Sequence, residues 1–271
     1  MRDTVTKRDR KIWDNIAAHW DEQIGEGNDF QKLLIIPATD RLLAITPGER
    51  VIDACSGNGN YSRRLSRAGA RVTAFDGSAA FVELAKKRTL QSDGDVAYHL
   101  VDACDANAVA AVAETISVDA YVCSMAMMDL PTLDPLLRAA RKHLKANGRF
   151  VFSVSHPCWN SNEADMTGRL VQSLGEPQQI FGVEVTRYAA DWPHLSRGLL
   201  NQPEPHWMYH RSLSTLFSAC FKAGFVIDAM EEPLFPEDLR TRSPFSWARR
   251  PDIPPAIIIR IVPSPGTPGE G

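Results

Sequence analysis

The sequence contains no apolar run close to the roughly 18 residues that a membrane-spanning helix requires. Residues 1–11 are charged throughout and lack the apolar core of a secretion signal. Lysine and arginine number 30 against 33 aspartate and glutamate residues, so the net charge is -3 and there is no overall attraction for nucleic acid or an anionic membrane. We therefore expect no membrane partner and no nucleic-acid partner.

Cysteine is scarce, and no two cysteines form a C-x-x-C pair. The five cysteines are Cys55, Cys104, Cys123, Cys158 and Cys220. An odd number at scattered positions predicts reduced thiols and a cytoplasmic location rather than a disulfide framework. His156 with Cys158, two ligands without partners, makes a poor zinc site, so we expect no metal.

Internal repeats are absent, and the only low-complexity stretch is the Pro- and Gly-rich end, residues 263–271. That stretch has no apolar side chain to bury, which predicts a disordered tail. The remaining composition, 44% hydrophobic and 23% charged, is typical of a globular protein, and 271 residues are enough to build a sizeable core.

What the sequence does contain is an alternation of strand-like and helical patterns between residues 50 and 155. The strand-like runs are 51–54, 71–76, 96–102, 119–124 and 150–155. From Leu133 to Leu144, apolar residues recur at the spacing of an amphipathic helix, which Asn147-Gly148 follows. The runs are too apolar for a sheet with one wet face. They predict a doubly wound α/β fold, with a parallel sheet covered by helices on both faces.

The flanking segments complete one expected domain over residues 1–262. Lys11 to Trp20 and Phe30 to Ile45 read as helices, and 225–230 and 256–262 read as two closing strands. Residues 156–210 show no sustained period, and a long irregular segment of this kind is typical of a functional lid. The expected parts are N-terminal helices (1–48), the core (49–155), the lid insertion (156–210), and a closing helix with its strands (211–262).

Acidic residues follow three of the predicted strands. Asp53 opens the segment Asp-Ala-Cys-Ser-Gly57-Asn-Gly59 at a strand-to-helix turn, where Gly57 and Gly59 let the backbone approach a ligand closely. Asp76 ends the next strand, where a carboxylate accepts hydrogen bonds from both hydroxyls of a ribose. Asp102 ends the third strand, where an acid can meet an adenine amino group. Together the three carboxylates define one crevice at the carboxyl edge of the sheet.

The turn itself helps to discriminate between ligands. A dinucleotide-binding turn has Gly or Ala three residues after its second glycine, but this chain has Ser62 there. The negative charge of Asp53 beside the turn repels a pyrophosphate and suits a ligand that carries an amino acid, a sulfonium and an adenosine. A nicotinamide-dependent dehydrogenase is therefore the disfavoured alternative.

These motifs resemble those of the class I S-adenosylmethionine-dependent methyltransferases, in particular the bacterial small-molecule type. The family's first motif is an acid followed by x-G-x-G-x-G, and Cys55 stands at its first glycine. The second motif matches Phe75-Asp76-Gly77-Ser78, the third Val101-Asp102-Ala103, and the fourth residues 119–129. The resemblance covers residues 12–155 well and 213–262 more loosely. It implies a seven-stranded, Rossmann-like sheet of order 3-2-1-4-5-7-6, in which residues 256–262 form the antiparallel last strand.

The resemblance also implies a cofactor, S-adenosyl-L-methionine, and the residues that bind it. It places an aromatic residue, Trp20, over the cofactor, although Trp20 also reads as plain packing. It places the backbone of Ser124 and Met125 beside the methionine moiety. The implied cofactor-binding set is Trp20, Asp53, Cys55, Ser56, Gly57, Asn58, Gly59, Asp76, Gly77, Ser78, Asp102, Ala103, Ser124 and Met125.

The implied activity is methyl transfer to a small-molecule acceptor by in-line displacement. No Asn-Pro-Pro-Tyr or related motif, which marks amino-methylation of bases and proteins, follows the fourth strand. The other open alternative is a cofactor-binding protein without catalysis, at which only Cys55 hints. A general base is needed only when the acceptor must lose a proton.

Three residues are the candidate bases. Asp129 lies just past the fourth strand, where it also reads as a helix N-cap. His156 leaves the fifth strand at the same edge of the sheet. His210 belongs to an aromatic and imidazole cluster over residues 206–211, which alternatively anchors the lid. Arg63, with its neighbour Arg64, reads as part of a solvated helix face.

Overall fold

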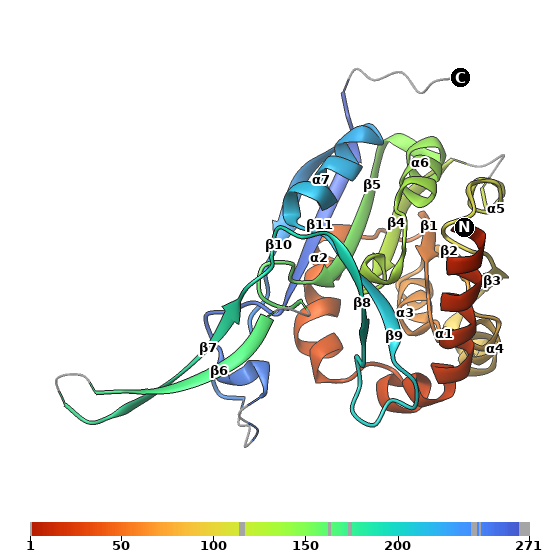
Figure 1. The fold of residues 1–271 in the computed structure, drawn as a ribbon. Coiled ribbons are helices and arrows are strands. Elements are labelled where there is room, and N and C mark those ends of the chain that lie inside the picture. The colour runs from red at the N-terminus through yellow and green to blue at the C-terminus, as the bar shows by residue number, and fades with distance from the viewer. Residues whose placement is uncertain are drawn as a thin grey trace.

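The computed structural model describes residues 2–113, 117–161, 164–172, 175–239, 243 and 245–265. Its centre is a seven-stranded sheet of order β10-β11-β5-β4-β1-β2-β3 (Figure 1). Only β11 runs antiparallel to its neighbours. The strands are β1 (Arg50–Ala54), β2 (Arg71–Asp76), β3 (Val96–Leu100), β4 (Val118–Ser124), β5 (Leu144–Ser155), β10 (Phe225–Glu231) and β11 (Ala256–Pro263). The predicted doubly wound order, with the last strand of the chain antiparallel, is confirmed.

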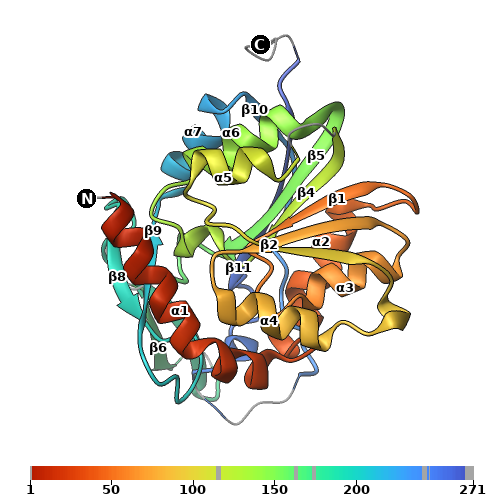
Figure 2. The same ribbon diagram turned by 90° about the vertical axis from the view of Figure 1, so that its right-hand side faces the viewer.

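Helices cover both faces of this sheet (Figure 2). One face carries α5 (Ala106–Ala111), α6 (Asp134–His143) and α7 (Leu213–Lys222), and the other carries α2 (Ile36–Leu43), α3 (Asn60–Arg67) and α4 (Ala79–Arg88). Within β4, Tyr121 and Cys123 enter the core under α6, while Ala120 and Val122 enter the opposite core. Strands buried on both faces have no polar side to alternate with, which is why the sequence showed continuous apolar runs.

The N-terminal helices differ in extent from the prediction. The first helix, α1, spans Arg2–Ile24, because its charged first half continues the helix ahead of the apolar pattern that begins at Ile12. The second consists of a π-helical turn, Gln31–Ile35, that runs directly into α2. Pro37, the second residue of α2, has no N–H to donate to the π-helical turn that precedes it.

Residues 156–210 form two antiparallel hairpins. The β6–β7 hairpin (Ala164–Val171 and Gln178–Val185) projects from the body (Figure 1). The β8–β9 hairpin (Trp192–Ser196 and His206–His210) lies beside α1 at the carboxyl edge of the sheet (Figures 1 and 2). Whether this segment acts as a lid stays a prediction.

The last strand of the chain runs into the segment predicted to be a tail. Strand β11 includes Pro263, and residues 266–271 of the predicted tail lie outside the described residues. Across the part of the chain that the structure describes, every helix is too short or too polar to cross a membrane.

Candidate functional site

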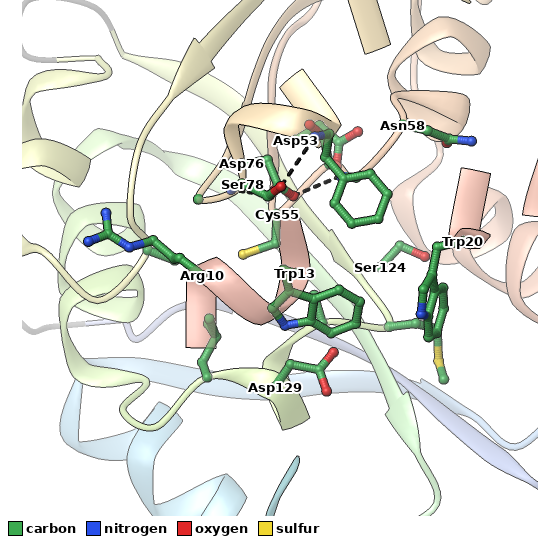
Figure 3. A pocket seen from close by; sticks show the side chains of 18 of the residues that line it. Arg10, Trp13, Trp20, Asp53, Cys55, Asn58, Asp76, Ser78, Ser124 and Asp129 are labelled. Atoms are coloured by element: carbon green, nitrogen blue, oxygen red, sulfur yellow. Dashed lines mark hydrogen bonds between the residues drawn. The ribbon is translucent and has the colours of Figure 1, made fainter. Parts of the chain in front are cut away.

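A pocket opens at the carboxyl ends of β1, β2 and β4, with α1 forming its opposite wall (Figure 3). All of the predicted cofactor-binding residues except Gly59 line it. Of the three candidate bases, Asp129 lines it and His156 and His210 do not. The topology therefore brings together residues from five separate segments of the sequence: α1 and the segments at the ends of β1, β2, β3 and β4.

The glycine turn after β1 explains why Gly57 and Gly59 differ. Both have left-handed backbone angles, with φ of +54° and +73°. A Cβ on Gly57 would meet no atom within 4 Å, so this glycine faces open pocket. A Cβ on Gly59 would collide with the hydroxyl of Tyr98. Gly59 therefore serves the packing of the turn against β3, and the structure does not place it on the pocket as the cofactor prediction expected.

Cys55 has the backbone conformation expected of the glycine that it replaces in the motif. Its φ is +56°, in the left-handed region that favours glycine. The hydrogen bond with Cys123 and burial both raise the pKa of the Cys55 thiol well above its usual value. The thiol is therefore protonated near pH 7, and the turn forms despite the extra Cβ.

Asp76 is held by the backbone on both sides. The Gly57 N–H donates to Asp76 Oδ2 at 2.9 Å, and the Ser78 N–H donates to Oδ1 at 2.8 Å. Burial nevertheless raises the pKa of Asp76 to about 6. Since each carboxylate oxygen has two lone pairs, both oxygens can still accept a hydrogen bond from a ligand hydroxyl.

Asp53 is almost fully buried, and the Ser62 hydroxyl donates to its Oδ2 at 2.5 Å. Burial raises the pKa of Asp53 to about 7. The Ser62 hydrogen bond opposes this rise, and the nearby charge of Asp76 adds to it. A cationic group bound beside Asp53 would favour the ionised carboxylate, whereas an anionic group would add to the repulsion.

Two tryptophans of α1 form an aromatic wall of the pocket (Figure 3). The rings of Trp13 and Trp20 meet edge to face at a centroid distance of 5.3 Å, and Trp13 also lies 6.1 Å from Phe81. The sequence analysis selected Trp20 and missed Trp13. The signal was present, because residues seven apart lie on one face of a helix.

Polar contacts pin α1 over the pocket. Asp14 Oδ1 accepts hydrogen bonds from the Ser78 hydroxyl at 2.6 Å and from the Ala80 N–H at 3.1 Å. Further along α1, Asp21 accepts a hydrogen bond from Asn58 Nδ2 at 2.9 Å and pairs with Arg88. These hydrogen bonds of Asp14 and Asp21 join α1 to the segments that follow β1 and β2, so the position of α1 and the shape of the pocket are linked.

The remaining predicted cofactor residues sit at the ends of β3 and β4. Asp102 Oδ1 accepts the Cys104 N–H at 2.9 Å, and its Oδ2 lies 3.6 Å from Nε of Arg10, a pocket residue that the sequence analysis missed. Met125 has a left-handed φ of +53°, and its N–H donates to Ser153 Oγ at 2.9 Å. Ser124, Met125 and Ala126, at and after this sharp turn, line the pocket.

Asp129 lies in a short turn, Met127–Asp129, and not at the start of α6, which begins at Asp134. The alternative interpretation of Asp129 as a helix N-cap is therefore wrong. Among the described residues no hydrogen bond reaches its buried Oδ1. Burial, and then the charges of Asp76 and Asp9, raise the pKa of Asp129 well above its usual value.

The structure places the two candidate histidines elsewhere. His156 Nε2 lies 2.7 Å from Glu232 Oε1, and its ring stacks on Trp159 at 4.1 Å. His210 Nε2 contacts the Tyr188 carbonyl oxygen at 2.8 Å. The reason is that the chain leaving β5 turns toward the segment before β11, away from the pocket: the His156 N–H donates to the Pro255 carbonyl.

The prediction of a solvated face on the first core helix is wrong for Arg63. Its side chain is fully buried, donates from Nη1 to the Asn58 carbonyl at 2.7 Å, and pairs with Glu26. The end of α1 and the loop after it cover this face of α3, which the pattern of α3 alone did not reveal. Arg64, one residue on, is exposed and pairs with Asp40.

Comparison with known proteins bears directly on this site. Residues 51–148, which include the glycine turn and the ends of β1 to β4, match the family model of a methyltransferase domain. The predicted resemblance to the class I methyltransferases is confirmed.

Individual relatives and one solved structure also resemble this chain. The chain is 32% identical over 107 residues to a ubiquinone biosynthesis O-methyltransferase from Xanthomonas oryzae pv. oryzae (strain PXO99A). The aligned part is 40% of this chain and 43% of that relative. It is 26% identical over 215 residues to an uncharacterized protein from Haemophilus influenzae, over 77% of this chain and 80% of that protein. The fold matches an S-adenosylmethionine-dependent methyltransferase from Mesorhizobium loti with a TM-score of 0.61 at 23% identity, over 83% of this chain and 96% of that one.

Proposed function

We propose that this protein binds S-adenosyl-L-methionine and transfers its methyl group to a small-molecule acceptor. The observation that carries the proposal is one pocket in which Asp53, Asp76 and Asp102, from the ends of β1, β2 and β3, converge beside the open turn at Gly57. A nucleoside joined to an amino acid through a cationic sulfonium matches those three acids and that turn.

The chain's own residues fit this ligand in distinct ways. Asp76 would accept hydrogen bonds from the ribose hydroxyls, and Asp102 would accept one from the adenine amino group. The charge of Asp53 would favour the amino-acid end, and Trp13 and Trp20 would exclude water from the bound sulfonium. When bound, the cofactor supplies an electrophilic methyl group, so the protein acts mainly by positioning the acceptor, an effect worth up to about 7–11 kcal/mol of barrier.

Charge in the pocket supports a small acceptor without negative charge. Asp9 and Asp129 line the pocket in addition to the acids assigned to the cofactor, whereas Arg10, next to Asp102, is the single basic residue among the described residues of the lining. The lining therefore offers a carboxylate or phosphate acceptor little positive charge with which to pair. Asp129 is the candidate base where the acceptor must lose a proton.

The alternatives have less support. The buried acid at Asp53 disfavours the pyrophosphate of a nicotinamide dinucleotide. The only hint of a non-catalytic protein, Cys55, loses force because the turn keeps its left-handed geometry at that residue. A cytoplasmic location, expected from the unpaired cysteines, stays a prediction.

Calorimetric titration of the purified protein with S-adenosylmethionine, S-adenosylhomocysteine and NAD tests the proposal. We expect both adenosyl ligands to bind and NAD to fail. Incubation with methyl-labelled cofactor and pools of neutral or amine metabolites should then yield a labelled product. Binding of NAD in preference to S-adenosylhomocysteine would contradict the assignment, and binding without any labelled product would favour the non-catalytic alternative.

A further inference from the structure

A chain of hydrogen bonds runs from Trp20 of α1 through Gln202, which is 3% exposed, to His206. The Trp20 Nε1–H donates to Gln202 Oε1 at 3.1 Å, and the Gly198 N–H donates to the same oxygen at 3.2 Å. Both partners can only donate, so they fix which end of the amide is oxygen. The amide nitrogen Nε2 then donates to the Glu204 carbonyl at 2.6 Å and to His206 Nδ1 at 3.0 Å.

This arrangement fixes the tautomer of His206. Because Nδ1 accepts a hydrogen bond, a neutral ring must carry its proton on Nε2. The ring is 2% exposed and packs against Trp13 at a centroid distance of 4.6 Å. Burial, and then the charge of His194, lower the pKa of His206 to about 4, so the ring is neutral near pH 7.

His206 Nε2 lies near the acid of the pocket but beyond hydrogen-bond distance of it. His206 Nε2 lies 3.7 Å from Asp129 Oδ1, the oxygen that no hydrogen bond reaches within the described residues. The other acids that act on Asp129 are Asp9 of α1 and Asp76 of β2, and both oppose its ionisation. Arg211 does not pair with the carboxylate, since its guanidinium donates to the carbonyls of residues 127 and 130 on either side of Asp129.

We propose that His206 is a positioning residue, whose Nε2–H, oriented by Gln202, favours the ionised form of Asp129 and enables Asp129 to take a proton from an O–H or N–H methyl acceptor. This inference rests on the proposed function. In the step, a lone pair on the acceptor oxygen or nitrogen forms the bond to the methyl carbon. The carbon–sulfur bond breaks with its electron pair left on sulfur, and the acceptor's proton passes to Asp129 Oδ1.

The proposal explains why an acid sits where burial favours its protonated form. A protonated carboxyl group cannot act as a base. A fixed N–H dipole close to Oδ1 stabilises the charged form and costs little reorganisation, because Gln202 and Trp13 hold the ring in place. Acceptors without a transferable proton would gain nothing from this pair.

Two variants separate the donor from the rest of the ring. In His206→Gln, the side-chain amide nitrogen occupies about the place of Nε2 and keeps a donor toward Asp129. In His206→Asn, the shorter amide still reaches Gln202 but not Asp129. His99→Asn, on the exposed side of β3, is the matched control.

The readout is the carboxyl ¹³C titration of Asp129 in the protein saturated with S-adenosylhomocysteine, with the signal identified by its loss in Asp129→Asn. We expect His206→Asn to raise the Asp129 midpoint by about one pH unit, while His206→Gln and His99→Asn stay near wild type. An unchanged midpoint in folded His206→Asn would overturn the proposal.

A second measurement does not depend on that variant folding. ¹⁵N spectra of the histidine rings in the wild-type protein should show His206 as a neutral ring with its proton on Nε2. Gln202→Glu, which replaces the donating amide by an oxygen, should move a proton onto Nδ1. A wild-type His206 protonated on Nδ1 would contradict the inference.

The outcome can be separated from failure of the proposed function. If wild type does not bind S-adenosylhomocysteine, the proposed function fails, and the same spectra of the free protein still decide the His206–Asp129 coupling. Once a labelled product identifies an O–H or N–H acceptor, His206→Asn should lower kcat by about 10²-fold with an unchanged KM for the cofactor, and His206→Gln should restore most of it. Equal kcat in both variants would overturn the positioning role.

Discussion

Single carboxylates dominate the chemistry of this protein, and each is set by its neighbours. Asp76 is buried but receives two backbone N–H groups, Asp53 is buried with one hydroxyl donor, and Asp129 has an oxygen that no hydrogen bond reaches in the described part of the chain. These differences in hydrogen bonding, and not the residue type, underlie the separate roles that we propose for the three acids as ribose partner, charge partner and base.

Asp76→Ala tests the ribose assignment. The change removes hydrogen bonds to a charged acceptor, each worth about 1.5–3 kcal/mol, so the dissociation constant for S-adenosylhomocysteine should rise roughly ten- to hundred-fold. Calorimetric titration measures it, with His99→Asn as the control. An unchanged dissociation constant in a folded Asp76→Ala variant would be incompatible with the assignment.

Asp53→Asn should lower the affinity for S-adenosylmethionine and raise the stability of the unliganded protein near pH 7. In the unliganded protein, Asp53 loses its proton near pH 7 when folded and near its ordinary value of 3.8 when unfolded. Its contribution to stability is therefore present below about pH 4 and is lost as the pH rises to about 7. Asparagine can still accept the Ser62 hydrogen bond but never ionises.

The melting temperature of Asp53→Asn relative to wild type should therefore rise between pH 4 and 7 and then level off. The associated gain in the free energy of unfolding has an upper limit of about 4 kcal/mol. Affinity for S-adenosylmethionine should fall in the same variant, because its cationic groups lose a negative partner. A pH-independent difference in melting temperature would refute the role of burial at Asp53.

At the scale of elements, α1 is the part that completes the pocket. It carries both tryptophans of the wall, and Tyr209 of β9 donates to its Asp9 at 2.5 Å. The contact of Asp9 with Tyr209 does not follow from the pattern of α1 taken alone, since Tyr209 is 200 residues away. Because α1 contacts the loops after β1 and β2, loosening α1 should lower the affinity for the cofactor.

Arg88→Ala tests this link by removing the partner of Asp21. We expect faster hydrogen–deuterium exchange in the last turns of α1 and a loss of S-adenosylhomocysteine affinity of several-fold, because Asp21 also holds Asn58 of the glycine turn. Arg138→Ala, which breaks an exposed pair with Asp134 on α6, is the matched control and should change neither. Equal behaviour of the two variants would show that α1 is held by its apolar contacts alone.

At the scale of the molecule, the β6–β7 hairpin stands apart from the sheet and the pocket (Figure 1). Two-stranded ribbons are marginally stable in water, so its base needs support. Arg250, which is 2% exposed, supplies it by donating to the Gly182 carbonyl at 2.9 Å and to the Thr167 carbonyl at 3.3 Å.

Arg250→Ala should therefore speed hydrogen–deuterium exchange in β6 and β7 by about tenfold or more, because a charged donor to two carbonyls is lost. Exchange in β4 and the affinity for S-adenosylhomocysteine should stay at wild-type values, since the two hairpin carbonyls to which Arg250 donates belong to residues outside the pocket lining. A large fall in affinity would show that the hairpin is coupled to the site.

The sequence by itself determined the parallel sheet with helices on both faces and nearly all of the pocket floor, and its resemblance to the class I methyltransferases implied the order of the strands. Apolar runs, turn glycines and acids at strand ends are local signals, and in a parallel sheet the carboxyl ends of the strands meet at one edge whatever the side chains do elsewhere. That is why Asp53, Asp76 and Asp102 could be placed together before any contact was known, and why Asp129 was found with them.

Only the tertiary structure decided what covers that floor. Trp13 and His206 lie nearly 200 residues apart and meet through packing that leaves no spacing in the sequence. The same holds for the errors: the burial of Arg63 depends on the end of α1, and the distance of His156 and His210 from the pocket depends on how the chain turns after β5 and β9. Local sequence patterns determine where each strand ends. Which distant segments then contact one another depends on packing and on the pairing of buried charges.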